Sequence, residues 1–134
     1  MKCLSIRQPF AELILSGRKT IELRSWSTSF RGWFLIHASG RADATACKAF
    51  GIDPEAVPRG AIAGKAFLYD VKEYGNDREF ALDRSRHLAA GGYPRQRYGF
   101  MLKGAERLAR PAGMRGRLGF FEVEWARGES NSDL

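Results

Sequence analysis

The apolar pattern of this chain changes its period at Gly17, and this change constrains the fold more than any other feature of the sequence. The apolar residues of the preceding segment QPFAELILS lie at the spacing of one helix face. The following segment TIELR alternates polar and apolar residues, which is typical of a half-buried strand. Glycine adopts a positive φ at low cost and therefore suits the end of a helix. The sequence predicts a helix over residues 8–16 and a strand over residues 20–24.

The rest of the chain continues this mixture of elements. Runs of apolar residues between turn signals predict further strands, and the segment RADATACKAF with Gly51 after it predicts a second helix. We expect strands over residues 2–6, 32–39, 61–71, 98–103 and 117–125, helical structure over 41–50 and within 79–89, and an irregular connection over 104–116. About six strands with two or three flanking helices indicate an α+β fold built around a small closed or nearly closed β-barrel.

The charged strand over residues 20–24 has two different faces. Its alternation predicts that Ile21 and Leu23 face the core, and that Thr20, Glu22 and Arg24 share the other face. The direction of Lys19 does not follow from this alternation, because Lys19 lies at the junction between helix and strand. An exposed pair such as Glu22 and Arg24 contributes little to stability and is often only a solvated surface feature. The pair can equally bind a ligand.

Length and composition indicate one domain. The chain has 134 residues, of which 44% are hydrophobic and 28% charged, as in ordinary globular proteins. We expect residues 1–125 to form this domain. Residues 126–134 (ARGESNSDL) show no apolar periodicity, and we expect them to be a flexible tail.

The charge of the chain is positive and uneven. The formal net charge is +7 and the isoelectric point is about 9.8. Residues 84–117 contain a single acid, Glu106, among nine lysines and arginines, and aromatic residues lie between them: Tyr93, Tyr98 and Phe100. Basic side chains neutralise phosphates and aromatic rings stack on bases, so this segment favours contact with nucleic acid. A solvated basic surface that keeps a small protein soluble is the alternative.

Several classes of protein have no support in the sequence. Cys3 and Cys47 show neither a disulfide framework nor a zinc motif, and the two histidines, His37 and His87, have no partner at ligand spacing. We therefore expect no metal and no cofactor. His37 lies in the apolar run WFLIHAS and is expected to be a hydrogen-bonded histidine of a buried strand. The N-terminal segment is neither a signal peptide nor a membrane span, so a cytoplasmic location is expected.

The segment CLSIRQPFAELILSGRKTIELRSW resembles the signature of the ASCH domain family, a member of the PUA-like superfamily. The family motif Gly-x-Lys-x-x-Glu-x-Arg is matched by Gly17, Lys19, Glu22 and Arg24. Later blocks, from RGWFLIHAS to RGRLGFFEV, are similar to the barrel strands of the family and occur in the same order. The resemblance covers about residues 2–125. It implies a PUA-like β-barrel with a cleft in which RNA, another nucleic acid or a nucleoside-like small molecule is bound.

The resemblance also implies which residues line this cleft. Lys19, Glu22 and Arg24 match the motif, and position near it adds Gln8, Ser25, Trp26 and Tyr98. Lysine and arginine can neutralise phosphate, glutamate can accept from an exocyclic amine, and Trp26 or Tyr98 can stack on a splayed-out base. Binding of nucleic acid, most simply RNA, is the leading expectation.

Three other functions stay open at this point. Some compact proteins with a similar motif are amidohydrolases of N4-acylated cytidine nucleosides, in which the motif lysine is catalytic. Lys19 matches that lysine, whereas Glu22 stands where those proteins have a threonine. A distant glutamate would complete such a site, and Glu73 and Glu79 are the candidates. A ribonuclease and a coactivator-type interaction domain are the remaining alternatives.

Overall fold

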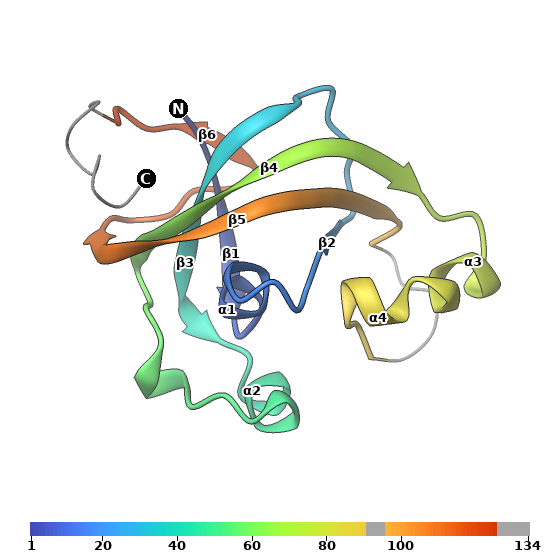
Figure 1. Ribbon diagram of the computed structural model, residues 1–134, viewed down its shortest axis with the longest axis horizontal. Helices are drawn as coiled ribbons and strands as arrows, with labels where there is room; N and C mark the ends of the chain where they lie inside the picture. Colours follow the sequence, from blue (N-terminus) through green and yellow to red (C-terminus); the bar gives the residue numbers. More distant parts are fainter. Residues whose placement is uncertain (91–95, 126–134) are drawn as a thin grey trace.

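The computed structural model describes residues 1–90 and 96–125 of the chain. The expected flexible tail, Tyr93 and Arg95 lie outside the described residues. Six strands form one mixed sheet in the order β2-β5-β4-β3-β1-β6 (Figure 1). In chain order, the elements are β1 (Lys2–Gln8), α1 (Phe10–Leu15), β2 (Ile21–Arg24), β3 (Gly32–Ala42), α2 (Ala44–Phe50), a 3-10 turn (Pro54–Ala56), β4 (Ala61–Glu73), α3 (Asp77–Leu82), α4 (Arg84–His87), β5 (Tyr98–Gly113) and β6 (Phe120–Glu122).

The change of period at Gly17 is confirmed as the boundary between a helix and a strand. Helix α1 ends at Leu15, Ser16 is its C-cap, and Gly17 follows with a φ of 84°. The amide of Lys19 then donates to the carbonyl of Leu13 over 2.9 Å, which fixes the path from the helix into β2. Lys19 is therefore held at the start of β2 by main-chain geometry.

The predictions for the C-terminal third of the chain are partly wrong. Residues 104–113 continue β5, where an irregular connection was expected, and the last strand spans only Phe120–Glu122. The sheet tolerates Gly104, with a φ of 65°, because the pairing of β5 with β4 shifts register near it. Pro111 lies in the part of β5 that is not paired with β2, since the β2 pairing ends at Met101. A proline is compatible with such a free strand edge.

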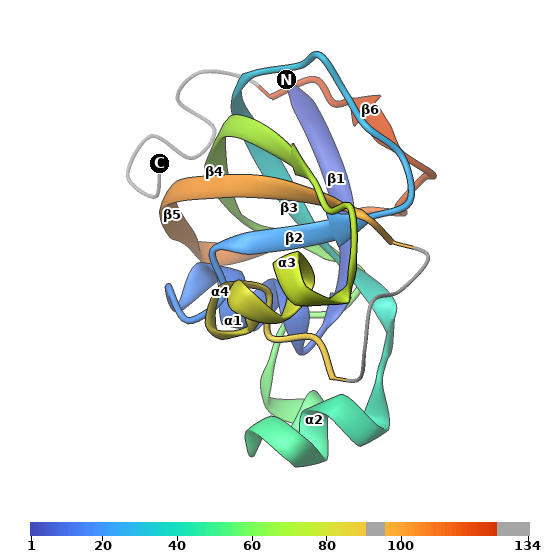
Figure 2. The same ribbon diagram turned by 90° about the vertical axis from the view of Figure 1, so that its right-hand side faces the viewer.

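The α+β class is confirmed, but a closed barrel is not. Strands β2 and β6 lie at the two ends of the sheet order, so the pairing does not close. The sheet nevertheless curves around a shared interior, with the helices gathered at one end (Figure 2). Between β2 and β1 the connection is made by a side chain: Arg24 Nη2 donates to the carbonyl of Ser5 over 2.8 Å.

The two faces of β2 differ from the simple alternation of core and solvent that the sequence predicts. Ile21 and Leu23 pack in a small cluster with Tyr74 and Phe80, outside the main core. Glu22 is paired across the sheet with Phe100, which is fully buried in the main core. Because directly paired residues share a face, the charged face of β2 points into the interior of the curved sheet. This face forms one wall of the cavity described below.

Four strands and one helix share the main core. The buried residues of this cluster come mainly from β1, β3, β4 and β5, with α1 covering one end. His37 of β3 is buried, as expected, and both of its ring nitrogens lie within hydrogen-bonding distance of a partner: Ser5 Oγ at 2.9 Å and the Met114 carbonyl at 2.6 Å. In the described residues, no helix is long and apolar enough to cross a membrane.

Candidate functional site

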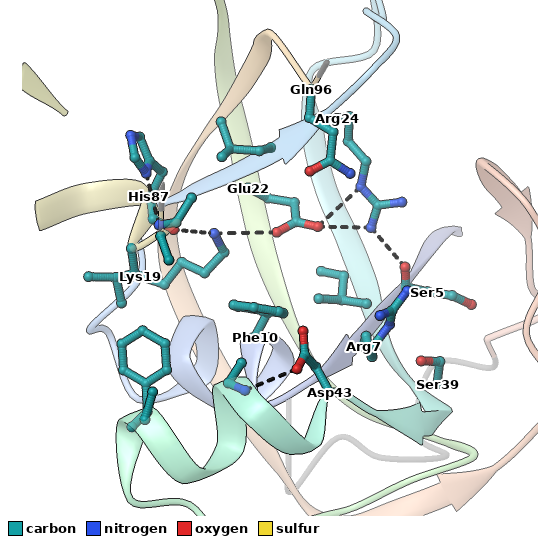
Figure 3. Close-up of a pocket in the computed structure, with 18 of the residues that line it drawn as sticks. Ser5, Arg7, Phe10, Lys19, Glu22, Arg24, Ser39, Asp43, His87 and Gln96 are labelled. Carbon is teal, nitrogen blue, oxygen red and sulfur yellow. Dashed lines mark hydrogen bonds and ion pairs between the residues drawn. The ribbon is translucent and has the colours of Figure 1, made fainter. Parts of the chain in front are cut away.

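A cavity of about 980 Å³ opens beside the charged face of β2 (Figure 3). Most of its lining comes from the end of β1 with the first turn of α1, strand β2, helix α2, and helix α4 with the residues after it. The end of β3 and the connection between β5 and β6 complete the described wall. Its charged lining residues, apart from the histidine, are Arg7, Lys19, Glu22, Arg24, Asp43, Arg84 and Arg117. Five of these are cationic and two are carboxylates, so the described part of the wall favours an anionic ligand.

Lys19 lies at one end of a row of polar groups in this wall. Its ammonium donates to the carbonyl of His87 over 2.6 Å and lies 3.6 Å from Oε1 of Glu22. It also lies 5.5 Å from the centre of the Phe10 ring, a cation–π distance. Only 4% of the Lys19 side chain is exposed, so the ammonium is almost fully removed from bulk water.

Glu22 and Arg24 continue the row toward β1. Oε2 of Glu22 accepts from Arg24 Nε over 3.1 Å and lies 2.9 Å from Arg24 Nη2. The same Nη2 donates to the Ser5 carbonyl over 2.8 Å. Figure 3 shows the resulting line from His87 through Lys19, Glu22 and Arg24 to Ser5. A buried carboxylate with cations on both sides holds those cations in fixed directions.

Burial changes the ionisation of Lys19. It lowers the pKa of this ammonium below its usual value, because the charged form has lost its hydration. The nearby carboxylate of Glu22 opposes this effect, and the charge of Arg24 adds to it. Lys19 therefore releases its proton more readily than a surface lysine does.

Helix α4 covers the Lys19 end of the row. His87 is fully buried, and its Nδ1 accepts from the amide of Ala89 over 3.0 Å. Nε2 then carries the proton and donates to the Phe80 carbonyl over 2.8 Å. Burial lowers the pKa of His87, which keeps the ring neutral. The neutral ring anchors α4, and α4 presents the main-chain oxygen that Lys19 binds.

The structure brings together Lys19, Glu22 and Arg24 of the predicted site, but the other four predicted residues do not line the cavity. Gln8 is fully buried and joins α1 to the Pro58 carbonyl. Ser25 is exposed beyond the end of β2. Trp26 packs edge-on against Phe100 and Phe120, at 5.3 and 5.9 Å between ring centres. Tyr98 is half-buried and packs against the main core. Phe100 is fully buried, so its ring is not available to stack on a base.

The structure places Glu73 and Glu79, the other candidate carboxylates, outside the cavity lining. The Glu79 carboxylate accepts from the amide of Gly75 over 2.6 Å. The second carboxylate of the described wall is Asp43 instead. Asp43 accepts from the amide of Ala46 over 3.0 Å and caps α2.

Several lining residues lie outside the Gly-x-Lys-x-x-Glu-x-Arg motif. Phe10, Asp43 and Phe50 come from three separate places in the chain, and α4 contributes His87. Phe10 and Phe50 read as ordinary apolar positions of helices, and Asp43 as an ordinary helix cap. No local signal distinguishes them, because only the packing of α1, α2 and α4 around β2 makes them neighbours. Among residues 1–90 and 96–125, no group of three or more His, Cys, Asp or Glu side chains could hold a metal ion.

The sequence was compared with known protein families. The family described as "ASCH domain" matches residues 4–108, which is most of the chain. The chain belongs to the ASCH domain family. The matched residues include α1, β2 and the Lys19–Glu22–Arg24 row, and the predicted membership of this family is confirmed.

Solved structures share the fold of this ASCH chain. It is similar to the crystal structure of ASCH from Zymomonas mobilis with a TM-score of 0.64 and 16% sequence identity, covering 98% of this chain and 91% of that chain. A tyrosine-to-phenylalanine mutant of the same protein gives a TM-score of 0.62 at 16% identity, covering 98% of this chain and 93% of the mutant chain. At this identity the likeness supports the fold alone.

A sequence relative is much longer than this chain. Activating signal cointegrator 1 of Mus musculus is 49% identical over 39 residues, which are 29% of this ASCH chain and 7% of the relative. The similarity is therefore confined to a short segment of a large protein.

Proposed function

We propose that this ASCH chain binds single-stranded RNA and takes one of its nucleotides into the cavity beside β2. The observation that supports this most directly is the row of Lys19, Glu22 and Arg24 in the cavity wall, where a carboxylate is held between two cations. Such a row offers donors and an acceptor in fixed positions. A nucleotide needs both, because its base presents donors and acceptors and its phosphate is anionic.

The two oxygens of Glu22 have different surroundings. Oε2 is engaged by Arg24, whereas Oε1 is 3.6 Å from the Lys19 ammonium, longer than a good hydrogen bond. Oε1 can therefore accept from a ligand, and an exocyclic amine such as N4 of cytosine has the matching chemistry. The nearby Phe10 ring provides an apolar surface for the base.

Size and charge also support a nucleotide. A volume of about 980 Å³ is at the upper end of the range of small-molecule sites. Arg7 and Arg117 are exposed at the cavity lining and can contact the phosphates on either side of the bound unit. The cations inside the cavity then contact the bound nucleotide, and the cations at the exposed edge of the cavity contact the phosphates of the neighbouring nucleotides.

The test is titration of a fluorescently labelled RNA of about four nucleotides, followed by anisotropy at several salt concentrations. Wild-type protein is expected to bind with an affinity that falls steeply as salt rises. Lys19→Met is expected to weaken binding at least about tenfold. The matched control is Arg110→Gln, which removes an exposed cation of the basic segment outside the cavity. Equal losses in the two variants would mean that overall charge, not the cavity, binds the RNA.

A second candidate is hydrolysis of the amide bond of N4-acylated cytidine. The observation that favours it is the lowered pKa of Lys19, since a lysine that loses its proton easily can act as a base or a nucleophile. Incubation with N4-acetylcytidine followed by chromatography tests it. Turnover that disappears in Lys19→Met would support the amidohydrolase, and absence of turnover in the wild type would exclude this substrate.

A further inference from the structure

We propose that the outer surface of the sheet carries a second binding surface for single-stranded nucleic acid, separate from the cavity. Its centre is a cluster of three aromatic side chains, Trp33 of β3 and Phe67 and Tyr69 of β4. Cationic side chains surround this cluster: Lys65, Arg86 and Lys103. We call these six residues the aromatic face. None of them lines the cavity.

The strand register places these residues together. Trp33 is paired with Phe67 across β3 and β4, and Phe67 is paired with Lys103 across β4 and β5. Directly paired residues point to the same side of a sheet. The alternating residues Ala66 and Leu68 are buried in the main core, so Phe67 and its partners point outward.

Two of the three aromatic side chains are exposed although they are large, and Phe67 is half-buried. Trp33 is 42% exposed and Tyr69 is 39% exposed. The Trp33 and Phe67 rings meet edge to face, with centres 5.2 Å apart. Gly104 makes room for the indole, since a Cβ at that position would lie 2.9 Å from Cη2 of Trp33. Exposed aromatic rings held in this way by the backbone are suited to stacking with bases.

Cations lie directly beside the rings. The ammonium of Lys65 is 4.3 Å from the centre of the Trp33 ring. The ammonium of Lys103 is 5.4 Å from the centres of both the Phe67 and Tyr69 rings. Arg86 Nη2 donates to the Tyr69 hydroxyl over 3.2 Å. A base that stacks on Trp33 displaces the Lys65 ammonium outward, toward the phosphate of the same nucleotide.

The occupant follows from this combination of charge and flat rings. Arg31 adds a further cation near the face and lies 3.8 Å from Asp70. Glu106 lies 3.7 Å from Lys65, and the charge of Asp83 acts on Arg86. Positive charge thus exceeds negative charge there. Lysine is depleted from the centres of protein–protein interfaces, whereas aromatic rings flanked by lysine and arginine are the usual platform for single strands.

The aromatic face begins where the cavity ends. Arg86 contacts Tyr69, while the next residue, His87, lines the cavity and binds Lys19 through its carbonyl. Helix α4 therefore has the aromatic face on one side and the cavity on the other. A strand with one nucleotide in the cavity can continue past α4 onto the rings.

The test uses labelled oligouridine of about twelve nucleotides, long enough to reach more than one subsite. Anisotropy gives the affinity, and tryptophan fluorescence reports contact with the indole. Trp33→Ala and Tyr69→Ala are each expected to weaken binding about tenfold, and Trp33→Ala to remove most of the fluorescence quenching. Lys103→Gln is expected to reduce the salt slope by about one. Leu82→Ala is the matched control, because Leu82 is 75% exposed and apolar but lies on α3, outside the aromatic face.

The outcomes separate this proposal from the cavity. If the cavity binds no nucleotide, Lys19→Met leaves the affinity for RNA unchanged, but Trp33→Ala still weakens binding of the long oligonucleotide. If Trp33→Ala and Tyr69→Ala both bind the long oligonucleotide as tightly as the wild type does, the proposal of a second surface is wrong. A second result would also overturn it: the wild type fails to bind RNA but self-associates with rising concentration, and Trp33→Ala abolishes this association. The aromatic face would then be a protein interface.

Discussion

The Lys19 ammonium donates a hydrogen bond of 2.6 Å to the main-chain carbonyl of His87, a residue 68 positions further along the chain. This bond joins the start of β2 to the end of α4, and both groups are buried. A second connection lies beside it, since the amide of Thr20 donates to the Arg86 carbonyl over 3.0 Å. The lysine of the ASCH motif is thus both a cavity residue and the anchor of the helix that covers one end of the cavity.

Lys19→Met should lower the free energy of unfolding as well as weaken RNA binding. The variant leaves the His87 carbonyl without its donor and Glu22 with one cation, so a loss of about 1–3 kcal/mol is expected. Denaturant unfolding measures it, and amide exchange should show faster opening of α4. Lys48→Met, at an exposed position of α2, is the control and should change stability by less than about 0.5 kcal/mol. Equal stability of both variants would show that the buried bond contributes nothing.

Arg24→Lys should weaken RNA binding although the charge is kept. Arg24 donates to Glu22 through Nε and reaches Ser5 through Nη2, and a single ammonium cannot reproduce this fork. We expect affinity for the short RNA to fall about tenfold, which corresponds to ~1.4 kcal/mol. Anisotropy titration measures it, with Arg110→Lys as the matched exchange outside the cavity. An Arg24→Lys variant that bound RNA as wild type does would mean that charge alone is needed at this position.

Stability should fall as the pH drops through the range in which an ordinary histidine titrates. Burial lowers the pKa of His87, and the charges of Lys19 and Arg84 act in the same direction, against the hydrogen bond to Phe80. The folded ring therefore stays neutral at a pH where the unfolded chain already binds a proton. Protonation of the unfolded state below the ordinary histidine pKa of about 6.5 therefore favours unfolding.

Denaturant unfolding between about pH 7.5 and about pH 5.5 tests this prediction. His87→Gln keeps an amide donor for the Phe80 carbonyl but removes the titrating ring, so its stability should depend less on pH over the same range. A variant with the same pH slope as wild type would assign the dependence to other groups.

Gly64→Ala should destabilise the fold strongly. A Cβ at Gly64 would lie 2.2 Å from the Glu106 carbonyl oxygen and 2.5 Å from Cδ2 of Leu15, so β5 or α1 must move. Overpacking of this kind costs about 1–3 kcal/mol, which thermal unfolding detects as a lower Tm. Gly40→Ala is the control on the same sheet, because a Cβ there meets nothing within 4 Å. A Tm for Gly64→Ala as high as that of the control would contradict the close approach of β4 and β5.

Local patterns account for the elements that were predicted well. Side-chain periodicity predicts the helix before Gly17, the strand after it and the helix before Gly51. A glycine with a positive φ follows each of the two helices. The motif residues Lys19, Glu22 and Arg24 lie within one turn and one short strand, so their proximity is also a local property. The continuation of β5 through residues 104–113 was missed because its glycines and Pro111 read as a connection, whereas pairing with β4 holds them in a strand.

The sequence by itself determined the α+β class, the family and the three charged residues of the candidate site. Only the tertiary structure decided where that charged face points. Alternation along β2 distinguishes two faces but cannot say which of them is enclosed, because that depends on the distant partners Phe100, Ser5 and His87. The same holds for Trp33, Phe67 and Lys103, which meet only through the register of three strands. Both surfaces arise from pairing between segments far apart in the chain, and the pattern of a single segment does not contain that information.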